Sequence, residues 1–268
     1  MDRSVFRYAL RSCLIGYLLV LIVLPISVIY MKGFSLGWDA FIYEIFDDIA
    51  YETIVLTVKL GVLTTIIQLF VGTIVAYTLV RYRFVGRGIL NSLVDLPFAL
   101  PTAVSGVILL TMFSPNSPMG SFLKSIHVEL LFNEYAIVIG MFFVTFPFVV
   151  RAVQPLLEQI NTEEEEASLL LGASPGTTFR RVILPVILPG ILSGGMLALS
   201  RALAEFGVIA LISGNLPMET LVSSVYIFSE IESFNPVAAS AVSILLLTLS
   251  FLILWMVHFI QRRGARYV

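Results

Sequence analysis

The chain has 268 residues, of which 58% are hydrophobic and 13% charged, and its mean hydropathy is +0.98. This composition excludes a soluble globular domain, and with a formal net charge of −2 we expect no nucleic-acid partner. The single cysteine, Cys13, excludes an intrachain disulfide. His127 and His258 stand apart from each other and from any cysteine or acidic cluster, so no metal site is predicted.

Apolar stretches of roughly 18 residues or more, each long enough to cross a bilayer, recur about six times. Backbone polar groups in lipid must be satisfied within the segment, so these stretches are expected to be helices. The prediction is an all-α, polytopic membrane protein in which residues 1–268 form one membrane domain. The spans are expected near residues 10–31, 54–80, 92–113, 135–154, 186–212 and 237–260.

The basic residues alternate between the segments that join these spans. Twelve of the 16 Lys and Arg lie in alternate segments: Arg3, Arg7, Arg11, Arg81, Arg83, Arg87, Arg151, Arg180, Arg181, Arg262, Arg263 and Arg266. The other connections hold Lys32 and Lys124 among many acids: Asp39, Glu44, Asp47, Asp48, Glu52, Glu129, Glu134, Glu219, Glu230 and Glu232. The positive-inside rule therefore predicts that both termini lie in the cytoplasm.

Two prolines interrupt the third predicted span. Pro97 and Pro101 remove backbone hydrogen bonds one turn apart, so we expect a kink or an unwound turn there. Irregular backbone at this depth is tolerated only where protein or a water-filled cavity covers it. Asp95, near the cytoplasmic end, could snorkel to the interface or cap a helix.

A charged loop between the fourth and fifth spans has the signals of two short helices. Thr162 is expected to cap the first, with Glu165 completing a capping box. Gly172 suits the left-handed residue that ends this helix. Ser174 followed by Pro175 predicts the start of a second helix.

The first of these helices has a small apolar stripe. Ala167, Leu170 and Leu171 follow at i, i+3 and i+4, opposite the acidic side chains. A solvated acidic helix is the plain alternative. A short amphipathic helix between membrane spans is also suited to docking into a groove on a soluble partner.

The fifth predicted span combines small residues with two charges. Its small residues, which let helices pack closely, are Gly190, Gly194, Gly195, Ala198, Ala202 and Ala204. Arg201 and Glu205 lie one helical turn apart. They could form a structural ion pair or line a transport path. Lys59, near the outer end of the second span, is expected to snorkel.

The charged loop resembles the cytoplasmic loop of permease subunits from ABC-type importers, where Glu-Ala-Ala is followed by Gly and by Ile-x-Leu-Pro. The matching residues are Glu166-Ala167-Ser168, Gly172 and Ile183-Leu184-Pro185, with Ser replacing the second Ala. The resemblance implies a type I permease fold in which residues 158–185 form a coupling-helix loop. The implied contacts to an ATP-hydrolysing partner are Glu165, Glu166, Ala167, Ser168, Leu170, Leu171, Gly172 and Ala173.

Further segments resemble one branch of this family. From about residue 50 onward, the segments 81–87, 95–106, 148–155, 172–185 and 204–217 look like the T-type permease of sulfate/thiosulfate importers. Phe206 departs from a pattern that more often has Tyr. Molybdate permeases share much of this pattern, so molybdate or tungstate is the alternative substrate.

The resemblance implies several partners and a place in the cell. It implies a second, related permease subunit, a dimer of ATP-binding subunits and an extracytoplasmic sulfate-binding protein, all at the inner membrane. The sequence contains no Gly-x4-Gly-Lys-[Ser/Thr] phosphate loop. ATP and magnesium are therefore expected on the partner, and this chain is expected to be a transport subunit and not an enzyme.

A doubly charged oxyanion needs hydrogen-bond donors or positive charge in a dry passage. Three other classes fit poorly: a secondary transporter needs carboxylates arranged for ion coupling, a channel needs a repeated filter, and an intramembrane enzyme needs a catalytic cluster. The candidate path residues for alternating-access transport are Thr102, Ser105, Ser200, Arg201, Glu205, Ser213 and Asn215.

Overall fold

The computed structural model describes residues 3–264, and these form helices with no strand. Residues 1–2 and 265–268, including Arg266 of the predicted cytoplasmic basic group, lie outside the described residues. The longer elements are α1 (Arg3–Leu18), α2 (Leu24–Gly33), α4 (Asp48–Arg81), α5 (Arg87–Ala99), α6 (Thr102–Phe113), α8 (Glu134–Gln159), α11 (Leu184–Leu203), α13 (Ser223–Glu232) and α14 (Pro236–Gly264). The shorter ones are α3 (Trp38–Ile45), α7 (Pro118–Ser125), α9 (Thr162–Leu170), α10 (Pro175–Thr178) and α12 (Ile209–Ile212), and the π-helical turns η1 (Leu19–Val23) and η2 (Phe179–Ile183).

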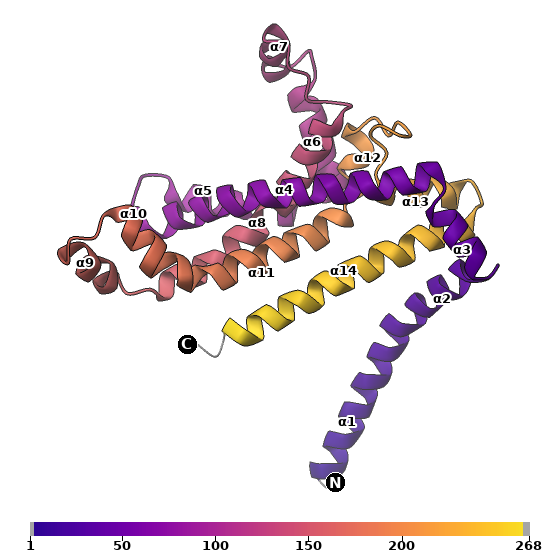
Figure 1. Ribbon diagram of the computed structural model, residues 1–268, viewed down its shortest axis with the longest axis horizontal. Coiled ribbons are helices and arrows are strands. Elements are labelled where there is room, and N and C mark those ends of the chain that lie inside the picture. The colour runs from indigo at the N-terminus through magenta and orange to yellow at the C-terminus, as the bar shows by residue number, and fades with distance from the viewer. Residues whose placement is uncertain (1–2, 265–268) are drawn as a thin grey trace.

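Four long helices, α4, α8, α11 and α14, form the body of the molecule (Figure 1). Helix α8 packs against both α4 and α11, and α11 also contacts α14. The side chains of Val149, Val150 and Val153 on α8 are fully buried. Helix α8 is therefore the centre of the core.

Small residues bring these helices together, as the sequence predicts for the fifth span. A Cβ atom at Gly194 would lie 2.9 Å from the Cα atom of Val149. On α4, a Cβ atom at Gly72 would lie 2.8 Å from the Cβ atom of the same Val149. Both distances are too short for a side chain, so α4 and α11 approach α8 more closely than larger residues would allow.

Within the described residues, five helices are long and apolar enough to cross a membrane. The α5–α6 pair, bent by 116°, would be a sixth span. The predicted break in the third span is confirmed, but Pro97 lies inside α5 and does not end it. Leu100 takes an extended backbone before Pro101, and this extended pair separates the two helices.

The prediction of a continuous fifth span over 186–212 is wrong. Helix α11 ends at Leu203, and the chain turns before the short helix α12. The cause is local, because the Glu205 side chain accepts a hydrogen bond from the Val208 backbone N–H at 3.1 Å. This bond closes the turn before α12, whose N-cap residue Val208 receives no side-chain cap, and it favours a turn over a continued helix.

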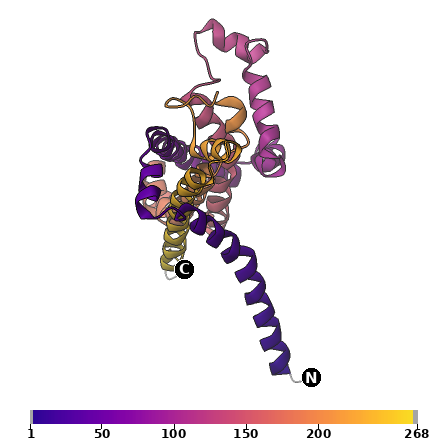
Figure 2. The same ribbon diagram turned by 90° about the vertical axis from the view of Figure 1, so that its right-hand side faces the viewer.

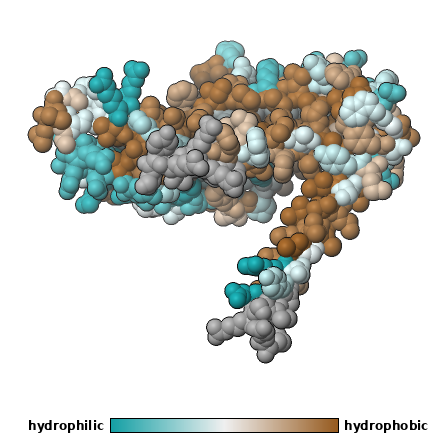
Figure 3. All heavy atoms as spheres, turned by 60° about the horizontal axis from the view of Figure 1, so that its bottom comes forward, coloured by the Kyte–Doolittle hydropathy of each residue, from teal (hydrophilic) through white to brown (hydrophobic). Residues whose placement is uncertain are grey.

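The N-terminal helix stands apart from the body (Figure 2). Between Leu10 and Lys32 no described side chain is buried, and Gly33, where α2 contacts α14, is the first buried residue. Apolar residues also cover much of the visible face of the body, while hydrophilic residues gather toward the end that carries α9 (Figure 3). An apolar surface of this extent needs lipid or another membrane subunit around it.

Candidate coupling and translocation sites

The charged loop forms two short helices, as predicted, at one end of the molecule (Figure 1). Gly172 has a φ angle of +86°, the predicted left-handed conformation that ends α9. The Ser174 hydroxyl accepts a hydrogen bond from the Thr177 N–H at 3.3 Å and caps α10, also as predicted.

The predicted cap at Thr162 is wrong. Asn161 takes the extended backbone of an N-cap without a side-chain cap bond, so Thr162 already belongs to α9. The Glu165 carboxylate does not complete a capping box either. Its Oε1 atom lies 2.5 Å from Nη2 of Arg81, so a distant guanidinium replaces the local backbone partner.

The tip of the loop presents apolar side chains to the outside. Leu170 and Leu171 are 88% and 89% exposed, and Ala167 and Glu166 beside them are also exposed. Exposed leucines at this density suit burial against another protein. Of the other predicted contact residues, Gly172 is exposed, Ala173 is partly exposed, and Ser168 shares a hydrogen bond with Thr178 at 3.0 Å.

Two breaks in the membrane helices meet inside the body. The α5–α6 break brings Thr102 against the turn between α11 and α12, where a Cβ atom at Gly207 would collide with the Thr102 hydroxyl. One turn along α6, a Cβ atom at Gly106 would lie 3.1 Å from the Cα atom of Val208. The two breaks thus pack against each other at Thr102 and Gly106, while Pro101 itself is exposed.

Arg201 and Glu205 lie beside these breaks and form an ion pair. Arg201 Nη1 lies 2.7 Å from Glu205 Oε2. The Glu205 side chain is 1% exposed, whereas that of Arg201 is 36% exposed. Ser224 on α13 donates a hydrogen bond to the Glu205 backbone carbonyl at 2.6 Å. The Glu205 side chain is therefore held inside the protein, while part of the Arg201 side chain stays accessible.

The remaining predicted path residues differ in accessibility. Ser105 is fully buried and its hydroxyl has no hydrogen-bond partner among the described residues, whereas Ser200 is partly exposed. Ser213 donates to Asn215 Oδ1 at 2.8 Å, and Asn215 Nδ2 donates to the Ala210 carbonyl at 2.8 Å. These two residues hold the loop after α12, where Asn215 has a φ angle of +54°.

The most extensive polar network was missed by sequence reasoning. Both oxygens of Asp95 accept hydrogen bonds from Arg151 on α8, at 2.6 and 2.7 Å, a partner that the sequence does not indicate. Arg151 also donates to the Asn91 side chain and backbone and to Gln154. The network fastens α5 to α8. The ring of Phe206, the departure from the T-type pattern, packs against that of Phe228 at a tilt of 47°, with centroids 5.1 Å apart.

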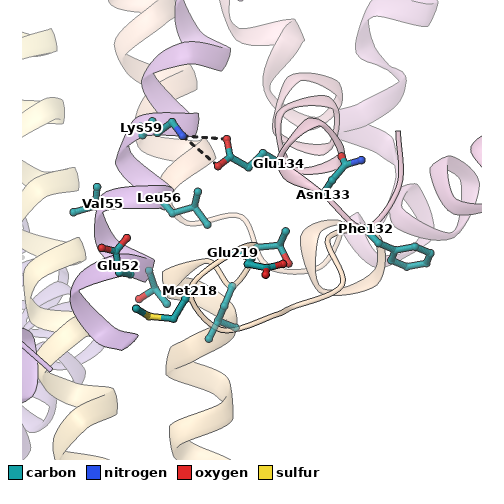
Figure 4. A pocket seen from close by; sticks show the side chains of 12 residues that line it. Glu52, Val55, Leu56, Lys59, Phe132, Asn133, Glu134, Met218 and Glu219 are labelled. Atoms are coloured by element: carbon teal, nitrogen blue, oxygen red, sulfur yellow. Dashed lines mark hydrogen bonds and ion pairs between the residues drawn. The ribbon is translucent and has the colours of Figure 1, made fainter. Parts of the chain in front are cut away.

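A pocket of about 440 Å³ opens between the first turns of α4 and the loops that precede α8 and follow α12 (Figure 4). Lys59, which the sequence predicts to snorkel, forms an exposed ion pair with its ammonium 3.1 Å from the Glu134 carboxylate. Glu52 and Glu219 line the same pocket. Three carboxylates against one ammonium make this pocket unsuited to a free dianion.

Acidic residues also gather around α3 and α13. Burial raises the pKa of the Glu44 carboxyl, and the charges of Asp47 and Glu230 raise it further. Burial and the same acidic neighbours raise the pKa of the Tyr226 hydroxyl. Within the described part of the chain, no group of three or more His, Cys, Asp or Glu side chains is placed to hold a metal ion.

A comparison with protein-family models matches residues 68–266 to the family described as binding-protein-dependent transport system inner membrane component. This matched range contains the α5–α6 break, the α9–α10 loop and the Arg201–Glu205 pair.

Curated relatives match over nearly the whole chain. A probable sulfate transport system permease protein cysT from Helicosporidium sp. subsp. Simulium jonesii is 41% identical over 251 residues, covering 94% of this chain and 93% of the relative. The corresponding Synechocystis protein is 37% identical, covering 94% and 88%. The protein from Salmonella typhimurium is 36% identical, covering 98% and 95%.

Solved structures share the fold at low identity. A chain of a bacterial alginate ABC transporter, crystallised with an alginate pentasaccharide-bound periplasmic protein, aligns with a TM-score of 0.79 at 19% identity and covers 97% of this chain and 95% of its own length. A chain of the methionine ABC transporter MetNI in an inward-facing conformation aligns with a TM-score of 0.55 at 23% identity, covering 80% and 93%.

Proposed function

Because this chain belongs to the family of binding-protein-dependent transport system inner membrane components, and within it to the sulfate transport system permeases, we propose that it is the membrane-spanning subunit of an ATP-driven sulfate importer. The observation that carries this proposal is 41% identity, over 94% of the chain, to a sulfate transport system permease. The molybdate or tungstate alternative is not favoured, since the curated relatives described above are named for sulfate.

The energy for uptake would come from a dimer of ATP-binding subunits that docks on α9. Three features of the loop support this docking: the exposed Leu170 and Leu171, the exposed Glu166, and the helix end at Gly172. The apolar pair would fill a groove on the ATPase. When the ATPases close, the docked helices would move with them and the spans would switch between inward-open and outward-open states.

The anion would pass along the accessible side of Arg201, near the junction of the two helix breaks. Glu205 holds the Arg201 side chain in place, and the 36% exposed guanidinium can still meet a ligand. The partly exposed Thr102 and Ser200 would add hydroxyl donors. Ser105, Ser213 and Asn215 would support this region, because all three are engaged or covered by neighbouring residues.

The importer would need two further proteins. A second permease subunit of related sequence would complete the passage and cover exposed apolar surface, such as the side chains from Leu14 to Leu24. An extracytoplasmic binding protein would deliver sulfate, since the acidic pocket around Glu52 and Glu219 would repel the free anion. The complex would lie in the inner membrane with both termini of this chain in the cytoplasm.

Radiolabelled sulfate uptake tests the proposal. The chain, expressed with its ATPase, second permease and binding protein in cells that lack sulfate uptake, should accumulate sulfate only while ATP is hydrolysed. Excess molybdate should not reduce the uptake of labelled sulfate. A parallel measurement with excess thiosulfate tells whether thiosulfate is carried by the same importer. Sulfate accumulation without an ATPase, or stronger competition by molybdate than by unlabelled sulfate, would contradict the proposed function.

A further inference from the structure

Helix α9 is attached to the body by very few contacts. None of its residues is buried, so no apolar core fixes its orientation. Its main neighbours are α10 and η2, which belong to the same loop. A helix held in this way depends on polar contacts for its position.

One guanidinium supplies the contact between α9 and the membrane helices. Arg81, the last residue of α4, lies with Nη2 2.5 Å from Glu165 Oε1. The same Nη2 atom donates a hydrogen bond to the backbone carbonyl of Ile160, the C-cap of α8, at 3.3 Å. Arg81 therefore joins three helix ends: its own, the end of α8 and the start of α9.

The charges at this junction agree with the helix dipoles. Arg81 stands at the carboxyl ends of α4 and α8, where a cation is favoured, and Glu165 stands in the first turn of α9, where an anion is favoured. The two side chains are only 13% and 17% exposed. Removing one of them leaves a poorly hydrated charge without its partner, which is more damaging than removing both.

We infer that Glu165 is a positioning residue that fastens the coupling helix to α4 and α8 through Arg81, so that movement of the docked ATPases reaches the membrane helices. The inference rests on the proposed function and assigns Glu165 a different role from Glu166. Glu166 is exposed beside the leucine tip, where the proposed ATPase would dock, whereas Glu165 pairs with Arg81 of its own membrane domain. The ring of Phe179 in η2, 5.8 Å from that of Tyr77 on α4, supports the same junction.

The ratio of sulfate transported to ATP hydrolysed tests the inference in the assembled complex. Glu165→Gln should lower this ratio at least fivefold while leaving ATP hydrolysis measurable, because the ATPases still bind the leucine tip. Glu158→Gln is the matched control. Glu158 is an exposed carboxylate at the end of α8 that accepts a hydrogen bond only from Gln154 among the described residues, so the ratio should stay at the wild-type value.

A mutant cycle separates this role from a general loss of stability. Arg81→Gln should lower the ratio as Glu165→Gln does, and the double variant should be no worse than the more affected single variant. Additive losses, or a Glu165→Gln ratio equal to that of Glu158→Gln, would overturn the inference. A wild-type complex that does not transport sulfate would instead contradict the proposed function.

Amide hydrogen exchange gives a second measurement that does not depend on the substrate. In the purified permease, Glu165→Gln should speed exchange of the α9 amides by about tenfold relative to Glu158→Gln, with exchange in α8 unchanged. Unchanged exchange in α9 would overturn the inference even if no transported anion had been identified.

Discussion

At the scale of single residues, the Arg201–Glu205 pair shows how a buried carboxylate can fix the position of a partly exposed guanidinium. Glu205 is covered, bonded to the Val208 N–H and paired with Arg201, so its charge is already satisfied. Arg201 extends from this fixed point to an accessible surface. Its side chain is thereby preorganised, which lowers the cost of binding an anion.

Substitutions at both positions test whether Arg201 meets the anion. Arg201→Gln should lower sulfate uptake by at least about tenfold, the effect of losing one charge-assisted hydrogen bond, and Arg201→Lys should keep part of the uptake. The double variant Arg201→Gln/Glu205→Gln removes the unpaired buried carboxylate. If the double variant recovers wild-type uptake, the pair is only structural and Arg201 does not line the path.

The raised pKa of Glu44 predicts that the stability of the protein depends on pH. Its pKa is raised in the folded protein, so the folded state binds more protons than the unfolded state and loses stability as pH rises from 4.5 through the raised pKa. The loss grows as pH rises through the raised pKa and is absent well below 4.5. Glu44→Gln should therefore raise the melting temperature at pH 7 and have no such effect near pH 4. Equal effects at both pH values would exclude titration of this carboxyl as the cause.

At the scale of elements, the sequence predicts local features well and distant pairings poorly. Gly172, Ser174 and the Arg201–Glu205 pair are recognised because their partners lie within a few residues. Arg151 and Asp95 are 56 residues apart, and no local pattern joins them. Thr162 was misassigned for the same reason, since the expected capping partner, Glu165, bonds to Arg81 on another helix.

The role of α9 in coupling can be tested by substituting Gly172, the residue that ends this helix. Gly172 has positive φ, where a β-branched residue costs about 1–3 kcal/mol. Gly172→Val should reposition the leucine tip and reduce sulfate uptake per ATP several-fold, while the membrane domain stays folded. Gly172→Asn tolerates the left-handed conformation and should stay close to wild type. Normal coupling in the valine variant would show that the end of α9 is not part of the transmission.

The contribution of the Arg151–Asp95 network between α5 and α8 can be measured as a change in the free energy of unfolding. Asp95→Asn should lower the free energy of unfolding by about 1 kcal/mol, because Asp95 is half exposed, and Arg151→Ala by roughly 2–3 kcal/mol, because all its hydrogen bonds are lost. Denaturation in detergent measures both. Asp39→Asn, at the opposite end of the molecule, is the control (Figure 1). An Arg151→Ala protein as stable as the control would mean that the network does not hold α5.

At the scale of the whole molecule, hydropathy located the spans, but packing decided their shape. Each predicted span contains a long apolar helix or, in the third span, a bent pair of helices. Length and composition are enough to locate such segments in the sequence. The 116° bend between α5 and α6 and the early end of α11 depend on tertiary packing, because the turn at Gly207 packs against Thr102 at the start of α6. Hydrogen bonds between polar side chains in the core, such as the one that Gln68 donates to Thr145 at 2.5 Å, also cannot be predicted from the sequence. No local pattern in an apolar helix indicates which partner a Thr or Gln will meet.

The orientation in the membrane follows from the charges and can be measured with single cysteines. In a Cys13→Ser background the chain has no other thiol. Val85 in the basic α4–α5 loop and Phe234 in the loop between α13 and α14 are almost fully exposed, so cysteines there should react readily. If the basic segments are cytoplasmic, a membrane-impermeant maleimide should label Phe234→Cys in intact cells and Val85→Cys only after permeabilisation. The reverse labelling would place α9 outside the cell, where no ATPase could reach it, and would remove the basis for coupling through this loop.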